Sequence, residues 1–216
     1  MKIDIDIVSD AICPWCFVGK RRLEKALKSL GPGHQVEIRW KPFQLNPAMP
    51  RDGMSRKEYR ERKFGSARAV EELNRRMNAV GAEEGIPFAL DKIQRTPNTF
   101  DAHRLLWLGG RRGVQDAVAE GLFRAFFTEG RDVGDREVLA DVAAAAGLDR
   151  KETLRFLGSG EGSSEVTAEE AKNRRLGVDA VPFFIVGGKY AIPGAQGPEV
   201  FLEAFQELSK AGAPSL

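Results

Sequence analysis

Residues 9–16 read Ser-Asp-Ala-Ile-Cys-Pro-Trp-Cys and contain both cysteines of the 216-residue chain. The segment before them, Lys2 to Val8, alternates polar and apolar residues, which predicts a strand with one buried face. After them, apolar residues recur at steps of three and four as far as Leu30, where Gly31-Pro32-Gly33 follows. This spacing predicts an amphipathic helix. The cysteine pair is therefore expected at the N-terminus of a helix that directly follows a strand.

The rest of the chain predicts a helical block between two segments of mixed strand and helix. A second strand is expected at Gln35 to Trp40, parallel to the first. Helical periodicity then predicts helices at Tyr59 to Val80, Phe100 to Gly109, Val114 to Phe127, Glu137 to Ala146 and Ser164 to Leu176. The tail predicts a hairpin of Pro182 to Val186 and Lys189 to Ile192 around Gly187-Gly188, followed by a helix at Pro198 to Leu208.

This order of elements predicts a mixed α/β protein, a thioredoxin fold interrupted by an all-helical insertion. The thioredoxin-like domain is expected to comprise residues 1–50 and 165–216, and the insertion residues 51–164.

The spacing of the two cysteines suits two-electron thiol exchange. Cysteine attacks as the thiolate, and the free N–H groups of a helix N-terminus favour the negative charge of Cys13. Pro14 is tolerated at the first helical position, and Cys16 lies one turn on, within reach of a disulfide with Cys13. Two other interpretations remain open. Half of a zinc site needs two more ligands, for which the chain offers His34 and His103, and buried cysteines also serve as small apolar residues.

Composition excludes some classes of function and sets an expected location. The formal net charge is +2 with interleaved signs, so no nucleic acid partner is expected. The most basic window, Arg51 to Arg68, is interpreted as a solvated helix face and is only a weak candidate for binding an acidic partner. No segment has the pattern of a signal peptide or a membrane span, so a cytoplasmic location without membrane association is expected. A catalytic pair fits that reducing compartment better than a structural disulfide.

Several motifs, taken together and in order, resemble the FrnE-like branch of the DsbA family of thioredoxin-fold oxidoreductases. They are Ser-Asp-x-x-Cys-Pro-Trp-Cys at 9–16, Trp-x-Pro-Phe-x-Leu-Asn-Pro at 40–47, Asn98-Thr99 with Ala102-His103-Arg104-Leu105, and Val-Pro-Phe-Phe at 181–184 followed by Tyr190 and Gly194-Ala195-Gln196. The resemblance extends from about residue 3 to about residue 208. It implies thiol–disulfide oxidoreductase activity, with Cys13 as the nucleophile, Cys16 as the resolving thiol and Pro182 as a cis-proline facing them.

The chain departs from this family pattern in three respects. DsbA is exported, whereas this sequence shows no export signal. Some FrnE-like proteins carry a further cysteine pair, which is absent here. Thioredoxin-fold members often bury a carboxylate six residues before the first catalytic cysteine, and Ile7 occupies that position. The proton acceptor for Cys16 is therefore unassigned. Asp10 is the nearest acid, and a helix cap is its simpler interpretation.

Substrate-binding residues are expected around the dithiol: Pro14, Trp15, Val181, Pro182, Asn98 and His103. Trp15 lies between the cysteines, where a large apolar side chain favours a contact surface. Asn98 directly precedes a helix and His103 lies within it, so a helix cap and a hydrogen-bonded histidine are the alternatives for these two.

Three functions are weighed on this basis. The first is a cytoplasmic dithiol–disulfide oxidoreductase for protein or small-molecule disulfides, which requires no cofactor or metal and uses glutathione at most as a reductant. The second is a glutathione-dependent isomerase or transferase of the 2-hydroxychromene-2-carboxylate isomerase or kappa-class type. The third is a non-catalytic redox sensor or binding module. The sequence does not give the oligomeric state.

Overall fold

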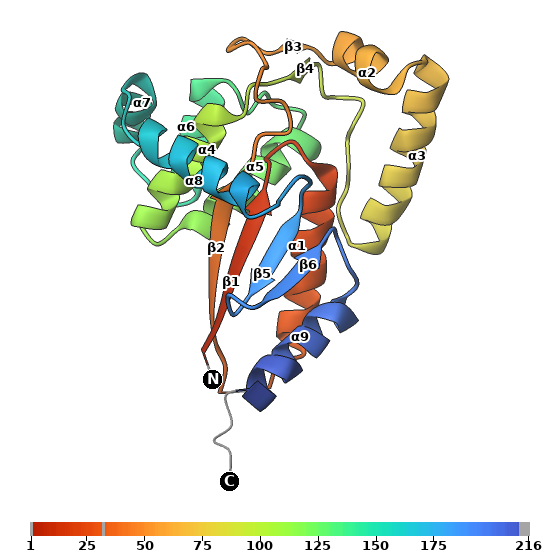
Figure 1. Ribbon diagram of the computed structural model, residues 1–216. Coiled ribbons are helices and arrows are strands. Elements are labelled where there is room, and N and C mark those ends of the chain that lie inside the picture. Colours follow the sequence, from red (N-terminus) through yellow and green to blue (C-terminus); the bar gives the residue numbers. More distant parts are fainter. Residues whose placement is uncertain (1, 32, 212–216) are drawn as a thin grey trace.

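The computed structural model describes residues 2–31 and 33–211 (Figure 1). The strands are β1 (Lys2–Ser9), β2 (Gln35–Pro42), β3 (Met54–Ser55), β4 (Arg95–Thr96), β5 (Phe183–Val186) and β6 (Tyr190–Pro193). The helices are α1 (Pro14–Lys28), α2 (Arg56–Phe64), α3 (Ala67–Glu83), α4 (Phe100–Arg111), α5 (Gln115–Phe127), α6 (Arg136–Ala145), α7 (Arg150–Gly158), α8 (Ser163–Arg175) and α9 (Pro198–Ala211). The predicted thioredoxin fold with a helical insertion is confirmed.

The central sheet joins the two ends of the chain in the order β2-β1-β5-β6. β1 and β2 are parallel as predicted, with Lys2 opposite Gln35 and Ser9 opposite Pro42. β5 is antiparallel to β1, and the β5–β6 hairpin turns at Gly187 and Gly188, both of which have a positive φ. Because β5 is antiparallel to β1, the loop before β5 lies beside the C-terminal end of β1. The two cysteines come directly after that end of β1.

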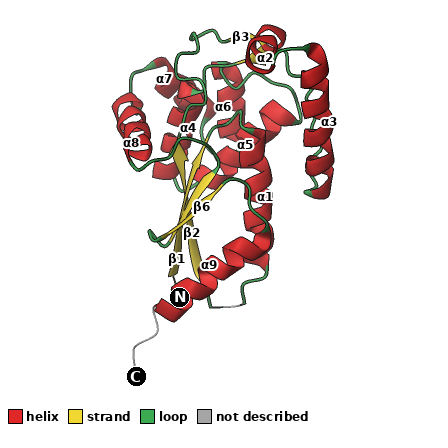
Figure 2. Cartoon of the chain, turned by 45° about the vertical axis from the view of Figure 1, so that its right-hand side comes forward, coloured by secondary structure: helices red, strands yellow, loops and turns green. Residues whose placement is uncertain are grey.

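The alternation in β1 separates a buried face from a charged face. Ile3, Ile5 and Ile7 are buried, whereas Asp4 and Asp6 are half-buried. α1 and α9 pack against each other, and Figure 2 shows both on one side of the sheet. The apolar face therefore forms the core between the sheet and these two helices.

The helices between β2 and β5 form the insertion, and α1 packs against it through aromatic rings. Phe17 of α1 stacks on Phe123 of α5 with ring centroids 5.2 Å apart, and it meets Phe88 edge-on. α4 contacts α5, α6, α7 and α8. Within the described ranges, no helix is long and apolar enough to cross a membrane.

The helical block differs from the prediction in three respects. The single helix expected over Tyr59 to Val80 is two helices, because Gly65 has φ +85° and ends α2. α7 was not predicted, although the side chain of its N-cap residue Asp149 accepts from the Glu152 N–H at 2.8 Å. The short β3–β4 pair also was not predicted. The expected boundary between the insertion and the thioredoxin-like domain, after residue 164, falls within the first turn of α8. The exact domain limits stay a prediction.

α1 lies directly against β5 and the loop before it at Gly19. A Cβ atom at this position would lie 2.9 Å from Phe184 Cζ and 3.2 Å from Pro182 Cγ. Gly19→Val is therefore expected to lower the free energy of unfolding by about 2 kcal/mol through overpacking. Urea denaturation measures this change. In the control Gly158→Ala, the new Cβ meets nothing within 4 Å, and equal midpoints for the two variants would contradict the prediction.

Candidate active site

The cysteine pair begins α1, as predicted. Cys13 is the N-cap residue, with an extended backbone (φ −92°, ψ 111°), and Pro14 follows as the first helical residue. The Cys13 N–H donates to the Asp10 carbonyl oxygen, and the Cys16 N–H donates to the Cys13 carbonyl oxygen, each at 3.0 Å. Both cysteines are free thiols in this structure. The side chain of Cys13 therefore lies at the positive end of the helix dipole, where a thiolate is stabilised.

The loop before β5 supplies the opposite wall of the site. The Val181–Pro182 peptide bond is cis, which confirms the sequence prediction. The Cys13 thiol donates to the Val181 carbonyl oxygen over 3.5 Å, although the two residues are 168 positions apart in the chain. Val181 is half-buried and Pro182 is buried. The structure thus brings Cys13, Val181 and Pro182 together.

The two thiols have different environments. Cys13 is 5% exposed and Cys16 is fully buried. Burial raises the pKa of the Cys16 thiol well above its usual value, and Cys13 raises it further, while the Ser9 side chain and the Asp10 backbone act to lower it. Cys16 therefore holds its proton in the resting protein, and Cys13 is the thiol nearer to solvent.

Asp10 is an anchor of the loop rather than a side-chain cap of α1. Its carboxylate accepts from the Leu45 N–H at 2.7 Å and from the Ile12 N–H at 3.4 Å. The first of these bonds ties the loop before Cys13 to the segment after β2. Burial raises the pKa of the Asp10 carboxyl, an effect that His103 and these N–H groups oppose.

His103 lies within α4, and Asn98 lies just before the first residue of that helix. His103 is buried and faces Asp10, with 3.7 Å between its Nε2 and Asp10 Oδ1. Asn98 is half-buried; its carboxamide donates to the Met49 carbonyl oxygen at 2.7 Å and accepts from the Phe100 N–H at 2.9 Å. Asn98 thus caps the start of α4, and its predicted substrate-binding role stays a prediction.

Pro14 and Trp15 lie between the two cysteines and were predicted to contact substrate. Both are half-buried, and Trp15 packs partly against the core. The substrate-contact role of these two residues stays a prediction. No set of three or more His, Cys, Asp or Glu side chains converges as a metal site in residues 2–31 and 33–211.

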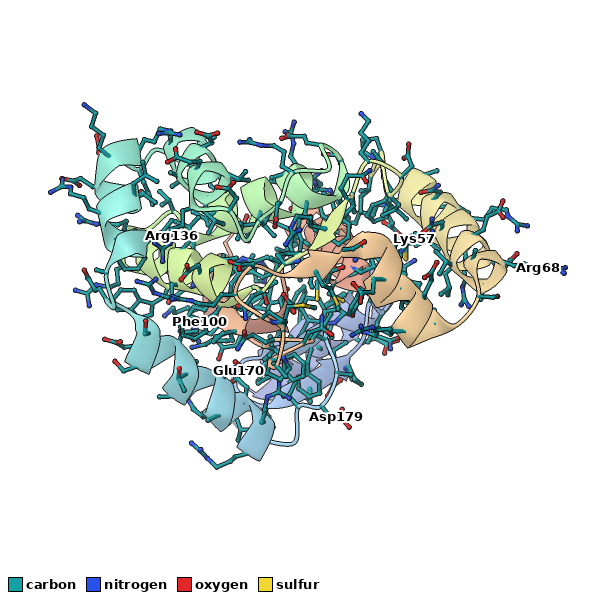
Figure 3. The ribbon with its side chains drawn as sticks, turned by 90° about the horizontal axis from the view of Figure 1, so that it is seen from above. Lys57, Arg68, Phe100, Arg136, Glu170 and Asp179 are labelled. Carbon is teal, nitrogen blue, oxygen red and sulfur yellow. The ribbon has the colours of Figure 1, made fainter. Side chains whose placement is uncertain are left out.

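A buried polar cluster next to the site was missed from the sequence. Glu170 of α8 accepts from the backbone N–H of Gln44 at 2.9 Å and from its carboxamide at 2.8 Å. Asn173 donates to the Pro42 carbonyl oxygen at 3.0 Å. In Figure 3 the Glu170 side chain lies on the inner side of α8. The only local signal was a Glu and an Asn three positions apart on one face of a helix.

Comparison with known proteins agrees with this geometry. YwbO, an uncharacterised protein of Bacillus subtilis, is 27% identical over 216 residues, which cover 97% of this chain and 99% of YwbO. The crystal structure of a probable DsbA oxidoreductase from Streptomyces coelicolor has 33% identity and a TM-score of 0.87, with 99% of this chain and 93% of that chain covered. A 2-hydroxychromene-2-carboxylate isomerase shares the fold at 18% identity and a TM-score of 0.69, with 96% and 97% covered.

The match to a known family extends over both the thioredoxin-like segments and the helices between them. The DSBA-like thioredoxin domain family matches residues 4–206, a range that includes the cysteines at the start of α1 and the cis-proline loop. The chain therefore belongs to the DSBA-like thioredoxin domain family, a family of thiol–disulfide oxidoreductases.

Proposed function

We propose that the protein is a dithiol–disulfide oxidoreductase of the FrnE-like branch that exchanges disulfides through Cys13 and Cys16. The observation that carries the proposal is the position of Cys13, at the N-terminus of α1 with its sulfur 3.5 Å from the Val181 carbonyl oxygen. Cys16, buried one turn along the same helix, is placed to attack the Cys13 sulfur. The preferred substrates are polypeptide disulfides, because the backbone of Val181 lies beside the nucleophile where an extended chain can pair with it.

The reaction proceeds in two exchanges. In the first, the Cys13 thiolate attacks a substrate disulfide, a Cys13–substrate disulfide forms, and the other substrate sulfur leaves as a thiolate that takes up a proton. In the second, Cys16 loses its proton and attacks the Cys13 sulfur, and the substrate leaves as its second thiol. The substrate disulfide gains two electrons, and the Cys13–Cys16 dithiol is oxidised to a disulfide. Oxidation of a substrate dithiol is the reverse sequence.

The chemistry needs no cofactor other than the redox-active cysteines, and glutathione is the proposed reductant that regenerates the dithiol. We infer a cytoplasmic location from the use of cysteine. Both cysteines belong to the proposed dithiol and are unpaired in this structure. The fold therefore does not depend on a structural disulfide, which suits a reducing compartment.

Catalysed reduction of a protein disulfide tests the proposal. With insulin as substrate and glutathione as reductant, the unmodified protein is expected to turn over, and Cys13→Ser is expected to lose about three orders of magnitude in rate. The matched control is Ser29→Ala, at an exposed position just after α1. Equal rates for Cys13→Ser and the unmodified protein would exclude the proposal. A single stoichiometric exchange without turnover would instead indicate a redox sensor.

A further inference from the structure

A buried acid–histidine pair lies directly behind the dithiol. The side chains of Asp10 and His103 are fully buried, and His103 Nε2 lies 3.7 Å from Asp10 Oδ1. Among the described residues, neither ring nitrogen of His103 makes a hydrogen bond of ordinary geometry, although the Phe43 backbone acts on the ring and favours its proton. Buried polar groups are nearly always satisfied, so an imidazole without a well-formed hydrogen bond beside a carboxylate calls for a functional explanation.

The backbone of Asp10 lies next to both cysteines. Its carbonyl oxygen accepts from the Cys13 N–H at 3.0 Å, and the Cys16 sulfur lies close enough to the Asp10 backbone and the Ser9 side chain for both to stabilise a Cys16 thiolate. The same residue carries the carboxylate, which two backbone N–H groups hold. The buried carboxylate therefore belongs to the residue whose backbone acts on the Cys16 sulfur.

The surroundings bring the proton affinities of Asp10 and His103 closer together. Burial raises the pKa of the Asp10 carboxyl and lowers the pKa of the His103 imidazole. A carboxylate whose pKa rises and a neighbouring imidazole whose pKa falls titrate as one coupled unit. With the carboxylate ionised and the ring neutral, the pair can accept one proton.

Glu170 is the other titratable group that acts on the ring of His103, from α8. Burial acts to raise the pKa of Glu170, but its hydrogen bonds with Gln44 and Arg174 outweigh burial and leave the pKa lowered. Glu170 therefore stays ionised, and its charge favours a proton on His103. It supports the pair rather than competing with it for the proton.

His103 also connects the pair to the outside of the fold. It lines a groove of about 1160 Å³ that runs along β2 between α4 and α8, whose lining includes Trp40, Trp107 and Val166. The buried ring therefore stands between Asp10 and the groove, while Cys16 remains shielded from solvent.

We propose that Asp10 is the proton acceptor for Cys16 and that His103 is a positioning residue that shares this proton and returns it to the groove. The inference rests on the proposed function. In the second exchange, the Cys16 S–H bond breaks and the proton passes to the Asp10–His103 pair. The Cys16 thiolate then forms the disulfide with Cys13, and the departing substrate thiolate is protonated from solvent. Related folds often place a buried carboxylate on the first strand, but in this chain Ile7 occupies that position and is buried in the core. Asp10 takes over the role of that carboxylate.

A chromogenic aromatic disulfide separates the two exchanges. The reduced protein releases one equivalent of nitrothiobenzoate when Cys13 attacks and a second when Cys16 resolves the mixed disulfide. At neutral pH, Asp10→Asn should slow the second release about 100-fold and His103→Gln about tenfold, with the first release unchanged. His34→Gln is the matched control, because His34 is exposed and should leave both releases unchanged.

The pH profile separates a proton acceptor from a merely structural residue. Towards the high pH at which Cys16 ionises by itself, the second release in both variants should approach that of the unmodified protein. The proposal would be overturned if Asp10→Asn gave the second release at the rate of the unmodified protein. It would also be overturned if the second release in this variant were slowed by the same factor at every pH. Absence of the first release from the unmodified protein would remove the proposed function as well, so the two failures are distinguishable.

The unmodified protein gives a second measurement that requires no substitution. With an internal base, the rate of the second release should rise with pH as the base ionises and then level off at a pH below the titration of Cys16. A rate that instead increases in proportion to hydroxide over the whole range below the titration of Cys16 would show that no internal base acts, and this result would also overturn the proposal.

Discussion

Cys16→Ser should accumulate a mixed disulfide on Cys13, whereas Cys13→Ser should form almost none. Cys13 is at the helix N-terminus and is the less buried thiol, so it meets the incoming disulfide. Cys16 is fully buried beside Cys13 and is shielded from an incoming disulfide. Without Cys16, the reaction stops after its first exchange, and release of the bound thiol should slow by about two orders of magnitude or more.

Mass spectrometry after brief exposure to glutathione disulfide measures this result. Cys16→Ser is expected to carry about one glutathionyl group per chain, removable by a reducing agent, and the unmodified protein is expected to form its internal disulfide instead. An adduct on Cys13→Ser but not on Cys16→Ser would reverse the two roles. Normal turnover by Cys16→Ser would favour the glutathione-dependent isomerase or transferase.

Lys20→Met should lower the free energy of unfolding by about 2 kcal/mol, because it removes a buried ammonium group together with its charged hydrogen bonds to partly exposed carboxylates. The Lys20 side chain is 5% exposed, and its ammonium forms ion pairs with Glu24 of α1 and with Asp116 and Glu120 of α5, the last two at 3.3 Å. These ion pairs fasten the helix that carries the cysteines to the insertion. Urea denaturation provides the measurement. The control Lys28→Met, at an exposed position of the same helix, should change stability by no more than about 0.5 kcal/mol.

The loss of stability in Lys20→Met is also expected to depend on pH. Burial acts to lower the pKa of Lys20, but the three carboxylates outweigh it and the pKa is raised above 10.5. This contribution to stability is present at neutral pH and is lost only as the pH rises through the folded value. Burial acts to raise the pKa of Glu120, but Arg21 and Lys20 outweigh it, so its contribution is lost as the pH falls below the usual value of 4.5. The difference between Lys20→Met and the unmodified protein should therefore be largest near neutrality; a difference that grows on acidification would contradict this assignment.

Local patterns in the sequence were sufficient for the framework of the fold and for the centre of the site. The alternation before Cys13 and the helical spacing after Cys16 place the dithiol between β1 and α1, because period two and period 3.6 are properties of neighbouring residues. The cis bond at Pro182 was implied by the resemblance to the DsbA family rather than by the local pattern, because a proline before an apolar run is cis in only about 5% of cases. The break at Gly65 and the short helix α7 were missed, since a helix boundary depends on a few residues whose local preferences are weak.

Only the tertiary structure decided what surrounds the two sulfur atoms. The Val181 carbonyl oxygen reaches Cys13 across 168 positions, and Glu170 reaches Gln44 across 126. His103 faces Asp10 because α4 packs behind the loop that begins α1, and Lys20 is buried because α5 lies against α1. No local pattern contains such contacts. They arise when segments that are distant in the chain bury their apolar surfaces against one another, and the polar groups carried into that interior take whichever partners the packing places beside them.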